Sequence, residues 1–172
     1  EPSRLDQAAL ERHYQRFHSY DWVYGQAMPC TFSCGERFPW GELTLELAVE
    51  PEGATLEGGF CWRVSSADAG GSGPFSPFPG MDRWLLLLEG AGFDLDFGAR
   101  GRVDLTEAFI PVQFSGDWPA HAVLVDGPSR DLNLMVDARR LRSSVEVLPL
   151  TAPRALPITA ATTLLFVARG TV

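Results

Sequence analysis

Histidine and cysteine are the side chains of this sequence that could bind a metal ion or act as nucleophiles. His13 and His18 are five residues apart, which places them on different faces of a helix. The third histidine, His121, falls between apolar stretches, and no His-x-His pair with a distant Glu occurs. The three cysteines lack a companion histidine at any indicative spacing: Cys30, Cys34 and Cys61. We therefore expect no bound metal or other cofactor and no cysteine nucleophile.

Paired carboxylates are the next candidates, because two acids held together can perform general acid–base catalysis. Asp94 and Asp96 are two residues apart, as are Glu50 and Glu52. Carboxylates at this spacing on a strand share one face, which is typical of a solvated surface. No Gly-x-Ser-x-Gly nucleophile turn is present. The residues by themselves do not predict an enzyme.

Arginine is the only cationic side chain available to hold an anion. All 14 basic residues are arginine, and lysine is absent. This excludes Schiff-base chemistry, a phosphate-binding loop of the Walker type, and kinases that need a strand lysine. The net charge of −8 argues against nucleic acid and against anionic membranes as partners.

Two predicted strands place polar hydrogen-bonding groups on one face. In the first, Arg63 and Ser65 alternate with Trp62 and Val64. In the second, Asp131 and Asn133 alternate with leucines; Asn133 is the sole asparagine of the chain and is disfavoured in mid-strand. A residue placed against its propensity often belongs to a polar network or a ligand site. Solvent-exposed faces of a sandwich would show the same alternation.

The elements that position these residues are predicted to be mostly strands. Residues 3–18 form the one clear helical pattern, with Leu10, Tyr14 and Phe17 on a single stripe. Short strands separated by Gly and Pro turns follow, which is typical of an all-β sandwich or barrel. The predicted strands are Cys30–Cys34, Leu43–Val49, Phe60–Ser66, Trp84–Glu89, Gly92–Phe97, Phe109–Phe114, Ala122–Asp126, Leu132–Val136, Val145–Leu150 and Thr163–Ala168.

The chain is also expected to be cytoplasmic. No charged-then-apolar opening typical of a signal peptide is present, and the longest apolar stretches, such as Trp84–Leu88, are too short to span a bilayer. The odd number of cysteines indicates buried free thiols rather than a disulfide framework.

The motifs of the chain from about residue 43 to 172 resemble those of the HutD/Ves family, in the family's order. They are Phe60–Asp68, Gly73–Arg83, Leu88–Gly90, Phe114–Asp117 and Asp126–Met135. The resemblance implies a cupin-like, two-lobed (bicupin) β-barrel linked to the control of histidine utilisation. Members of the family are not established enzymes. The implied ligand is a small carboxylate of the urocanate or formyl- or formimino-glutamate type.

On this resemblance, a ligand carboxylate meets Arg63 and Arg83, because a guanidinium fork fits a carboxylate in two parallel hydrogen bonds. Asp131 and Asn133 meet the nitrogen end of the ligand, since Asn offers both a donor and an acceptor. Two further residues complete the expected site: Ser65 donates from the face of Arg63, and Glu46 orients one arginine. No catalytic residue is expected.

Two departures from the family pattern stand out. The segment Trp40–Glu46 lacks the lysine, asparagine and triple glycine of the family's opening motif, although Thr44 and Glu46 match it. After the predicted strand Thr163–Ala168 the chain ends where a hairpin partner is expected, so we expect a truncated second lobe. A truncated lobe would expose apolar strand faces, which favours association into a homodimer.

The N-terminal third has a different resemblance. Phe17–Gln26 and Arg37–Leu47 resemble the C-terminal accessory domain of lipoate–protein ligase, which does not contain the ligase active site. This predicts a division into residues 1–48 and a cupin-like domain over residues 49–172. Two alternatives to a ligand-binding regulator stay open: an accessory module of a lipoate-ligase fusion, and a cupin-type enzyme with a metal or a general base in the barrel.

Overall fold

A computed structural model describes residues 43–170, which contain nine β-strands and no α-helix. The strands are β1 (Leu43–Glu50), β2 (Trp62–Ala69), β3 (Gly73–Pro74), β4 (Met81–Glu89), β5 (Phe93–Asp96), β6 (Arg102–Leu105), β7 (Val112–Ser115), β8 (His121–Leu124) and β9 (Ser129–Asp137). A single turn of 3-10 helix, η2 (Gly98–Arg100), follows β5. The chain divides into two compact units, residues 34–149 and residues 1–33 with 150–172, and every strand described here lies in the first.

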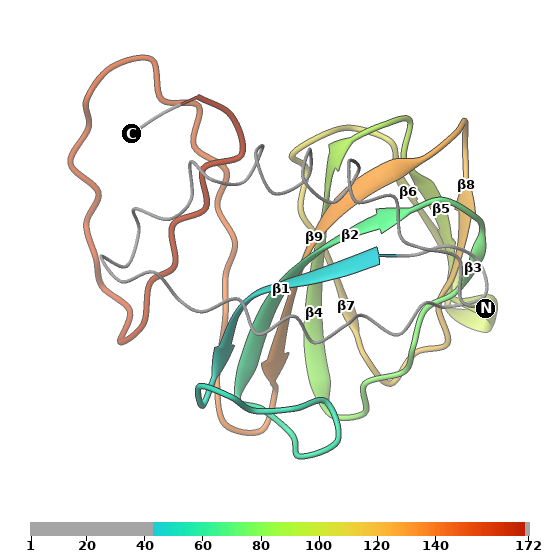
Figure 1. The fold of residues 1–172 in the computed structure, drawn as a ribbon, viewed down its shortest axis with the longest axis horizontal. Coiled ribbons are helices and arrows are strands. Elements are labelled where there is room, and N and C mark those ends of the chain that lie inside the picture. The colour runs from blue at the N-terminus through green and yellow to red at the C-terminus, as the bar shows by residue number, and fades with distance from the viewer. Residues whose placement is uncertain (1–42, 171–172) are drawn as a thin grey trace, which may run out of the picture. The chain divides into compact units, whose positions relative to one another are not determined.

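The strands form two antiparallel sheets. The five-stranded sheet has the order β1-β2-β9-β4-β7, and the four-stranded sheet has the order β3-β8-β5-β6. Figure 1 shows β1, β2, β9 and β4 side by side, so that the last strand of the chain is inserted between two early ones. Two irregularities interrupt the ladders, one between Glu46 and Ala48 in β1 and one between Leu87 and Glu89 in β4.

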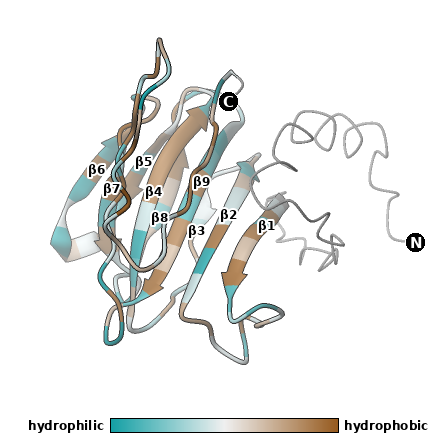
Figure 2. Cartoon of the chain, turned by 90° about the vertical axis from the view of Figure 1, so that its left-hand side faces the viewer, coloured by the Kyte–Doolittle hydropathy of each residue, from teal (hydrophilic) through white to brown (hydrophobic). Residues whose placement is uncertain are grey.

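The hydrophobic core lies between the two sheets. The strand β4 contributes Leu85 and Leu87, both almost fully buried, and Figure 2 shows the hydrophobic colour along this strand. Opposite them, the four-stranded sheet contributes Phe93, Leu95 and Leu105. The two sheets are therefore packed face to face, and the side chains of β4 that point toward the four-stranded sheet define the inner face of the five-stranded sheet.

The predicted all-β class is confirmed, and seven of the predicted strands overlap observed ones. The described residues form two separate sheets rather than a closed barrel. The predicted strands Val145–Leu150 and Thr163–Ala168 are wrong: residues 141–170 contain no strand. Both segments have β-branched and apolar side chains, but within the described residues neither has a neighbouring strand to complete a ladder. The strands Gly73–Pro74 and Arg102–Leu105 were not predicted.

Several predictions lie outside the described residues. They are the helix over residues 3–18, the strand Cys30–Cys34, and most of the ligase-like segment. The division at residue 48 stays a prediction. Within residues 43–170, no helix is long and apolar enough to cross a membrane.

Candidate functional site

The six residues predicted to bind a ligand all lie on the inner face of the five-stranded sheet. Directly paired residues of antiparallel strands point to the same side, so the ladders define rows across the sheet. One row contains Arg63, Met135, Arg83 and Phe114. The next contains Glu46, Ser65, Asn133 and Leu85, and the third contains Ala67, Asp131 and Leu87. Because Leu85, Leu87 and Phe114 belong to the core, the polar members of these rows face inward as well.

The inner face is thus divided between an apolar and a polar half. The strands β4 and β7 supply the apolar half, against which the four-stranded sheet packs. The strands β1, β2 and β9 supply most of the polar side chains. Burying a polar group costs free energy unless the group is hydrogen-bonded. A polar half inside a small sandwich is therefore a candidate binding site.

Arg63 is held by two neighbours on the polar half. Its Nε donates to Oε2 of Glu46 over 2.7 Å, and its Nη1 donates to Oγ of Ser65 over 3.1 Å. Arg63 is 8% exposed, whereas the side chain of Glu46 is 38% exposed. The expected orientation of an arginine by Glu46 is therefore present as a contact. Ser65 accepts a hydrogen bond in this arrangement rather than donating one.

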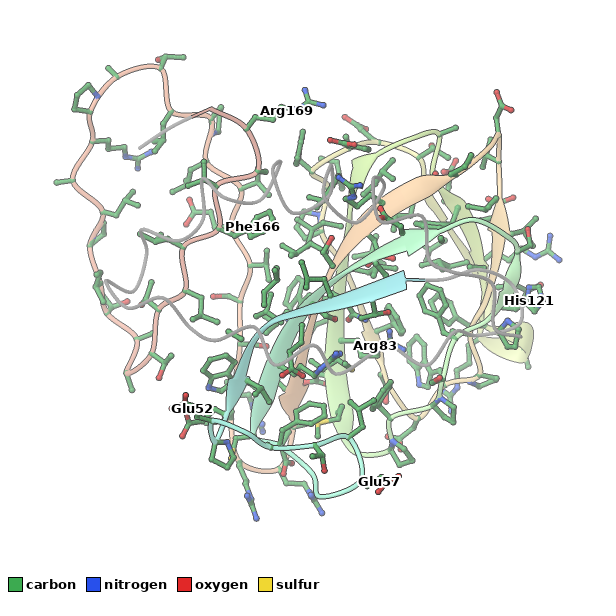
Figure 3. The ribbon with its side chains drawn as sticks, in the orientation of Figure 1. Glu52, Glu57, Arg83, His121, Phe166 and Arg169 are labelled. Atoms are coloured by element: carbon green, nitrogen blue, oxygen red, sulfur yellow. The ribbon has the colours of Figure 1, made fainter. Side chains whose placement is uncertain are left out.

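Arg83 lies deeper, in a box of three phenylalanine rings. Its guanidinium carbon is 5.1 Å from the ring centre of Phe114, 5.2 Å from that of Phe75 and 5.5 Å from that of Phe78. Its Nη1 donates to the carbonyl oxygen of Ser76 over 3.3 Å. The residue is only 4% exposed, and Figure 3 labels it in the interior of the structure. Ring faces attract a cation, which allows this charge to be buried.

Asp131 and Asn133 lie next to each other on the inner face of β9. Asp131 is 3% exposed and is flanked across the sheet by Ala67 and Leu87. The backbone carbonyl of Asp131 accepts a hydrogen bond from Oγ of Ser66 over 2.8 Å. The Oδ1 atom of Asn133 is buried and accepts no hydrogen bond from any described residue. An unsatisfied amide oxygen on this face is ready to accept a donor from a bound molecule.

The charges of this face determine what it can bind. The six predicted residues include two guanidinium groups, Arg63 and Arg83, and two carboxylates, Glu46 and Asp131, so the formal charges of these six balance. Such a face suits a small molecule that carries one carboxylate together with an N–H group. Among residues 43–170, no three side chains of His, Cys, Asp or Glu are grouped in a way that could hold a metal ion.

A separate hollow of about 380 Å³ lies at the end of the five-stranded sheet. It is lined by Asp68, Ala69, Gly70, Glu89, Gly90, Pro128, Ser129 and Arg130. Arg130 donates to Asp68 over 2.6 Å and is 3.5 Å from Glu89. None of the six predicted residues lines this hollow.

Sequence reasoning missed the residues that surround Arg83. Phe75 and Phe78 belong to a motif of the family resemblance, Gly73–Arg83, but neither ring was given a role. Both rings lie in the loop before β4 and contact Arg83 from there. The only sequence signal for these contacts is the number of aromatic residues close to one arginine in the chain. Phe114, on the neighbouring strand, is brought to the same place by the β4–β7 register.

Two carboxylates among the described residues have lowered pKa values, and neither is one of the six residues predicted to bind a ligand. Hydrogen bonds from the Arg139 side chain and backbone lower the pKa of Asp137, which ends β9. A backbone hydrogen bond from Gly98 and the charge of Arg102 lower the pKa of Asp96. Both carboxylates organise turns, so the shifts indicate structural roles.

Two curated proteins are similar in sequence to this chain. Protein Ves of Citrobacter koseri is 38% identical over 89 residues, which cover 51% of this chain and 46% of that protein. The uncharacterised 21.2 kDa protein of the hutC 3′ region of Pseudomonas putida is 34% identical over 113 residues, covering 64% and 58%. The chain thus spans about half the length of the curated relatives it matches.

A solved structure shows the same likeness. HutD from Pseudomonas fluorescens SBW25, determined in a formate condition, has a TM-score of 0.52 and 38% identity, and the match covers 59% of this chain and 55% of that one. The sequence profile of the HutD family matches residues 35–172, which include part of the segment interpreted as ligase-like. The lipoate-ligase resemblance stays a prediction. The chain belongs to the HutD family.

Proposed function

We propose that this chain binds a small carboxylate metabolite on the inner face of the five-stranded sheet and acts as a cytoplasmic regulator linked to histidine utilisation. The observation that carries the proposal is the burial of two arginines, Arg63 and Arg83, in one cross-strand row beside polar Asn133 and Asp131. The finer architecture expected from the resemblance, a cupin-like barrel with two lobes, is part of the same proposal.

The spacing of the row suits a carboxylate between the two arginines. Arg63 and Arg83 stand on either side of Met135, two strand spacings or roughly 10 Å apart at Cα. Two arginine side chains reaching from either side can contact one anion above Met135. Asn133 is two residues along β9 from Met135, roughly 7 Å, and Asp131 is roughly 13 Å along the same strand. A nitrogen group of the ligand then meets Asn133 first and Asp131 at the far end.

The balance of charge favours particular ligands. A doubly charged phosphate would face Glu46 and Asp131 without compensation, whereas a carboxylate with an N–H group satisfies both signs. Urocanate and the formyl- or formimino-glutamates have this chemistry. The P. putida relative is named from the hutC 3′ region, and one solved relative is called HutD, which is the support for a role near histidine utilisation.

Isothermal titration calorimetry with urocanate and with N-formyl-L-glutamate tests the proposal. We expect binding by the wild type and a loss of about 30-fold or more in affinity for Arg83→Ala, because removing one partner of a buried ionic contact costs about 2 kcal/mol or more. Arg102→Ala is the matched control, since Arg102 is exposed and pairs with Asp96 on the other sheet. Absence of heat with both ligands on a folded sample would reject the proposal.

A further inference from the structure

The segment Phe75–Gly80 covers the guanidinium of Arg83. Two of the three rings of the box, Phe75 and Phe78, come from this segment, and so does the carbonyl of Ser76 that accepts from Nη1. The third ring, Phe114, is on β7 and is fixed by the sheet. The direction in which Arg83 presents its N–H groups therefore depends on a segment that contains no regular secondary structure.

The segment is itself attached to the connection between β7 and β8. The N–H of Phe78 donates to the carbonyl of Gly116 over 2.9 Å, and the N–H of Gly116 donates to the carbonyl of Met81 over 2.7 Å. The N–H of Gly80 donates to Oδ1 of Asp117 over 3.1 Å. At the other end, the N–H of Phe75 donates to the carbonyl of Ala120 over 2.8 Å. The segment is thus fixed at both ends by residues 116–120.

Gly116 is needed because the two backbones approach closely. A Cβ atom at this position would overlap the carbonyl oxygen of Phe78 and would lie 3.1 Å from that of Met81. The obstacle is backbone, so it cannot rotate away as a flexible side chain would. A side chain at residue 116 would therefore displace the part of the segment that contains Phe78.

We propose that Gly116 and Asp117 are positioning residues, which act through the segment Phe75–Gly80 to hold Arg83 in the orientation that receives a ligand carboxylate. This inference rests on the proposed function, because that function supplies the ligand carboxylate for which Arg83 is oriented. Both residues contact the segment through the hydrogen bonds described above. Their effect is to fix the guanidinium before binding, so that less conformational entropy is lost when the ligand is bound.

The side-chain ¹⁵N–¹H spectrum of Arg83 tests the positioning without any ligand. The Nε–Hε signal of Arg83 is identified by its loss in Arg83→Lys. In the wild type we expect it to be displaced from the other arginine signals, because three aromatic rings surround the guanidinium. Asp117→Ala removes the acceptor of the Gly80 N–H and should move the signal toward the others. Asp117→Asn retains an Oδ1 acceptor and should restore it.

Ligand affinity for the same variants provides the second readout. With urocanate or N-formyl-L-glutamate, we expect Asp117→Ala to weaken binding by roughly tenfold, comparable to one lost hydrogen bond, and Asp117→Asn to bind like the wild type. Gly116→Ala should act in the same direction as Asp117→Ala. Gly58→Ala is the control, because Gly58 lies in an exposed loop where the nearest atom to a new Cβ is the flexible Thr55 side chain.

The outcomes separate the two proposals. If Asp117→Ala moves the Arg83 signal but the wild type binds neither ligand, the positioning is upheld and the proposed ligands are rejected. If the wild type binds a ligand and Asp117→Ala changes neither the Arg83 signal nor the affinity, the positioning role is overturned. Should Gly116→Ala fail to fold, the comparison of Asp117→Ala with Asp117→Asn decides the question.

Discussion

Glu46 and Arg63 are joined by a 2.7 Å contact from Nε to Oε2, although they are not opposite each other in the sheet. The residue paired with Glu46 is Ser65, and the register of β1 shifts directly after Glu46. Such an irregularity bends a strand and redirects its side chains. The contact therefore depends on a local feature of β1 as well as on the choice of residues. It keeps the Arg63 charge paired while the side chain is buried.

Glu46→Ala should lower the free energy of unfolding by about 1 to 3 kcal/mol, which is less than the cost of breaking a fully buried pair because Glu46 is 38% exposed. Glu46→Gln, which keeps an acceptor for Nε, should lose less. Urea denaturation of the purified variants measures both effects. Glu50→Ala is the control, since Glu50 is exposed at the end of the same strand. Equal losses for Glu46→Ala and Glu50→Ala would contradict the role of the pair.

Asn133→Leu is expected to separate binding from stability. The Oδ1 atom of Asn133 is buried and accepts no hydrogen bond from residues 43–170. Replacing Asn133 by an apolar side chain of similar size therefore removes an unsatisfied polar atom and breaks no hydrogen bond to Oδ1. We expect stability in urea to stay the same or to rise by about 1 kcal/mol, and the affinity for urocanate or N-formyl-L-glutamate to fall by roughly tenfold.

The control for this variant is Gln113→Leu, which makes the same type of change at an exposed position of β7. It should alter neither property. If Asn133→Leu unfolded the chain, Asn133 would belong to a structural hydrogen-bond network and its assignment to ligand binding would be wrong.

Gly92 and Gly98 both have positive φ angles, +89° and +63°, but differ in the space around them. A Cβ at Gly92 would overlap the carbonyl oxygen of Leu105, whereas nothing lies within 4 Å of one at Gly98. Gly98→Ala should cost about 1 kcal/mol for the left-handed backbone alone, and Gly92→Ala about 3 kcal/mol or more. Thermal unfolding of the two variants side by side measures the difference. Similar melting temperatures would mean that β5 and β6 separate easily.

The alternation of side chains along β2 and β9 was predictable from the sequence, and it correctly places Arg63 with Ser65 and Asp131 with Asn133. What alternation could not provide is which face is buried. A polar face is normally the solvent face, yet Arg63 is 8% and Ser65 2% exposed. The polar face is buried because the cross-strand register aligns it with Leu85, Leu87 and Phe114, which pack in the core between the sheets.

The cross-strand row that contains Arg63 and Arg83 could not be predicted from local sequence patterns. It exists because β9 is inserted between β2 and β4, although β9 begins 40 residues after β4 ends (Glu89 to Ser129). Pairing between distant segments also explains the wrong strand predictions, since Thr163–Ala168 has strand-like residues but no described strand beside it. Strand alternation singled out Arg63, Ser65, Asp131 and Asn133. The family resemblance added Glu46 and Arg83 and supplied the expected ligand roles, and the register places all six candidates on one face.

Asp137 should make the stability of the chain depend on pH in acid. It is 2% exposed, its Oδ1 accepts from both the backbone N–H and Nε of Arg139, and its Oδ2 accepts from Nη2, each over 3.0 Å. These bonds favour the carboxylate and lower its pKa below the ordinary 3.8. The unfolded chain then binds the proton more readily than the folded chain, so stability from this group is present above the unfolded pKa and is lost as the pH falls through the folded pKa.

Urea unfolding midpoints of the wild type and of Asp137→Asn, measured from pH 6 down to about pH 2, test this expectation. The wild type should be the more stable near pH 6, and the difference should shrink steadily as the pH falls below about 4. Asp96→Asn is the comparison, because the pKa of Asp96 is also lowered and some acid sensitivity should persist in each single variant. A gap between wild type and Asp137→Asn that stays constant over this range would show that ionisation of Asp137 contributes nothing, and that the turn after β9 is held by its backbone bonds from Arg140 and Leu141 alone.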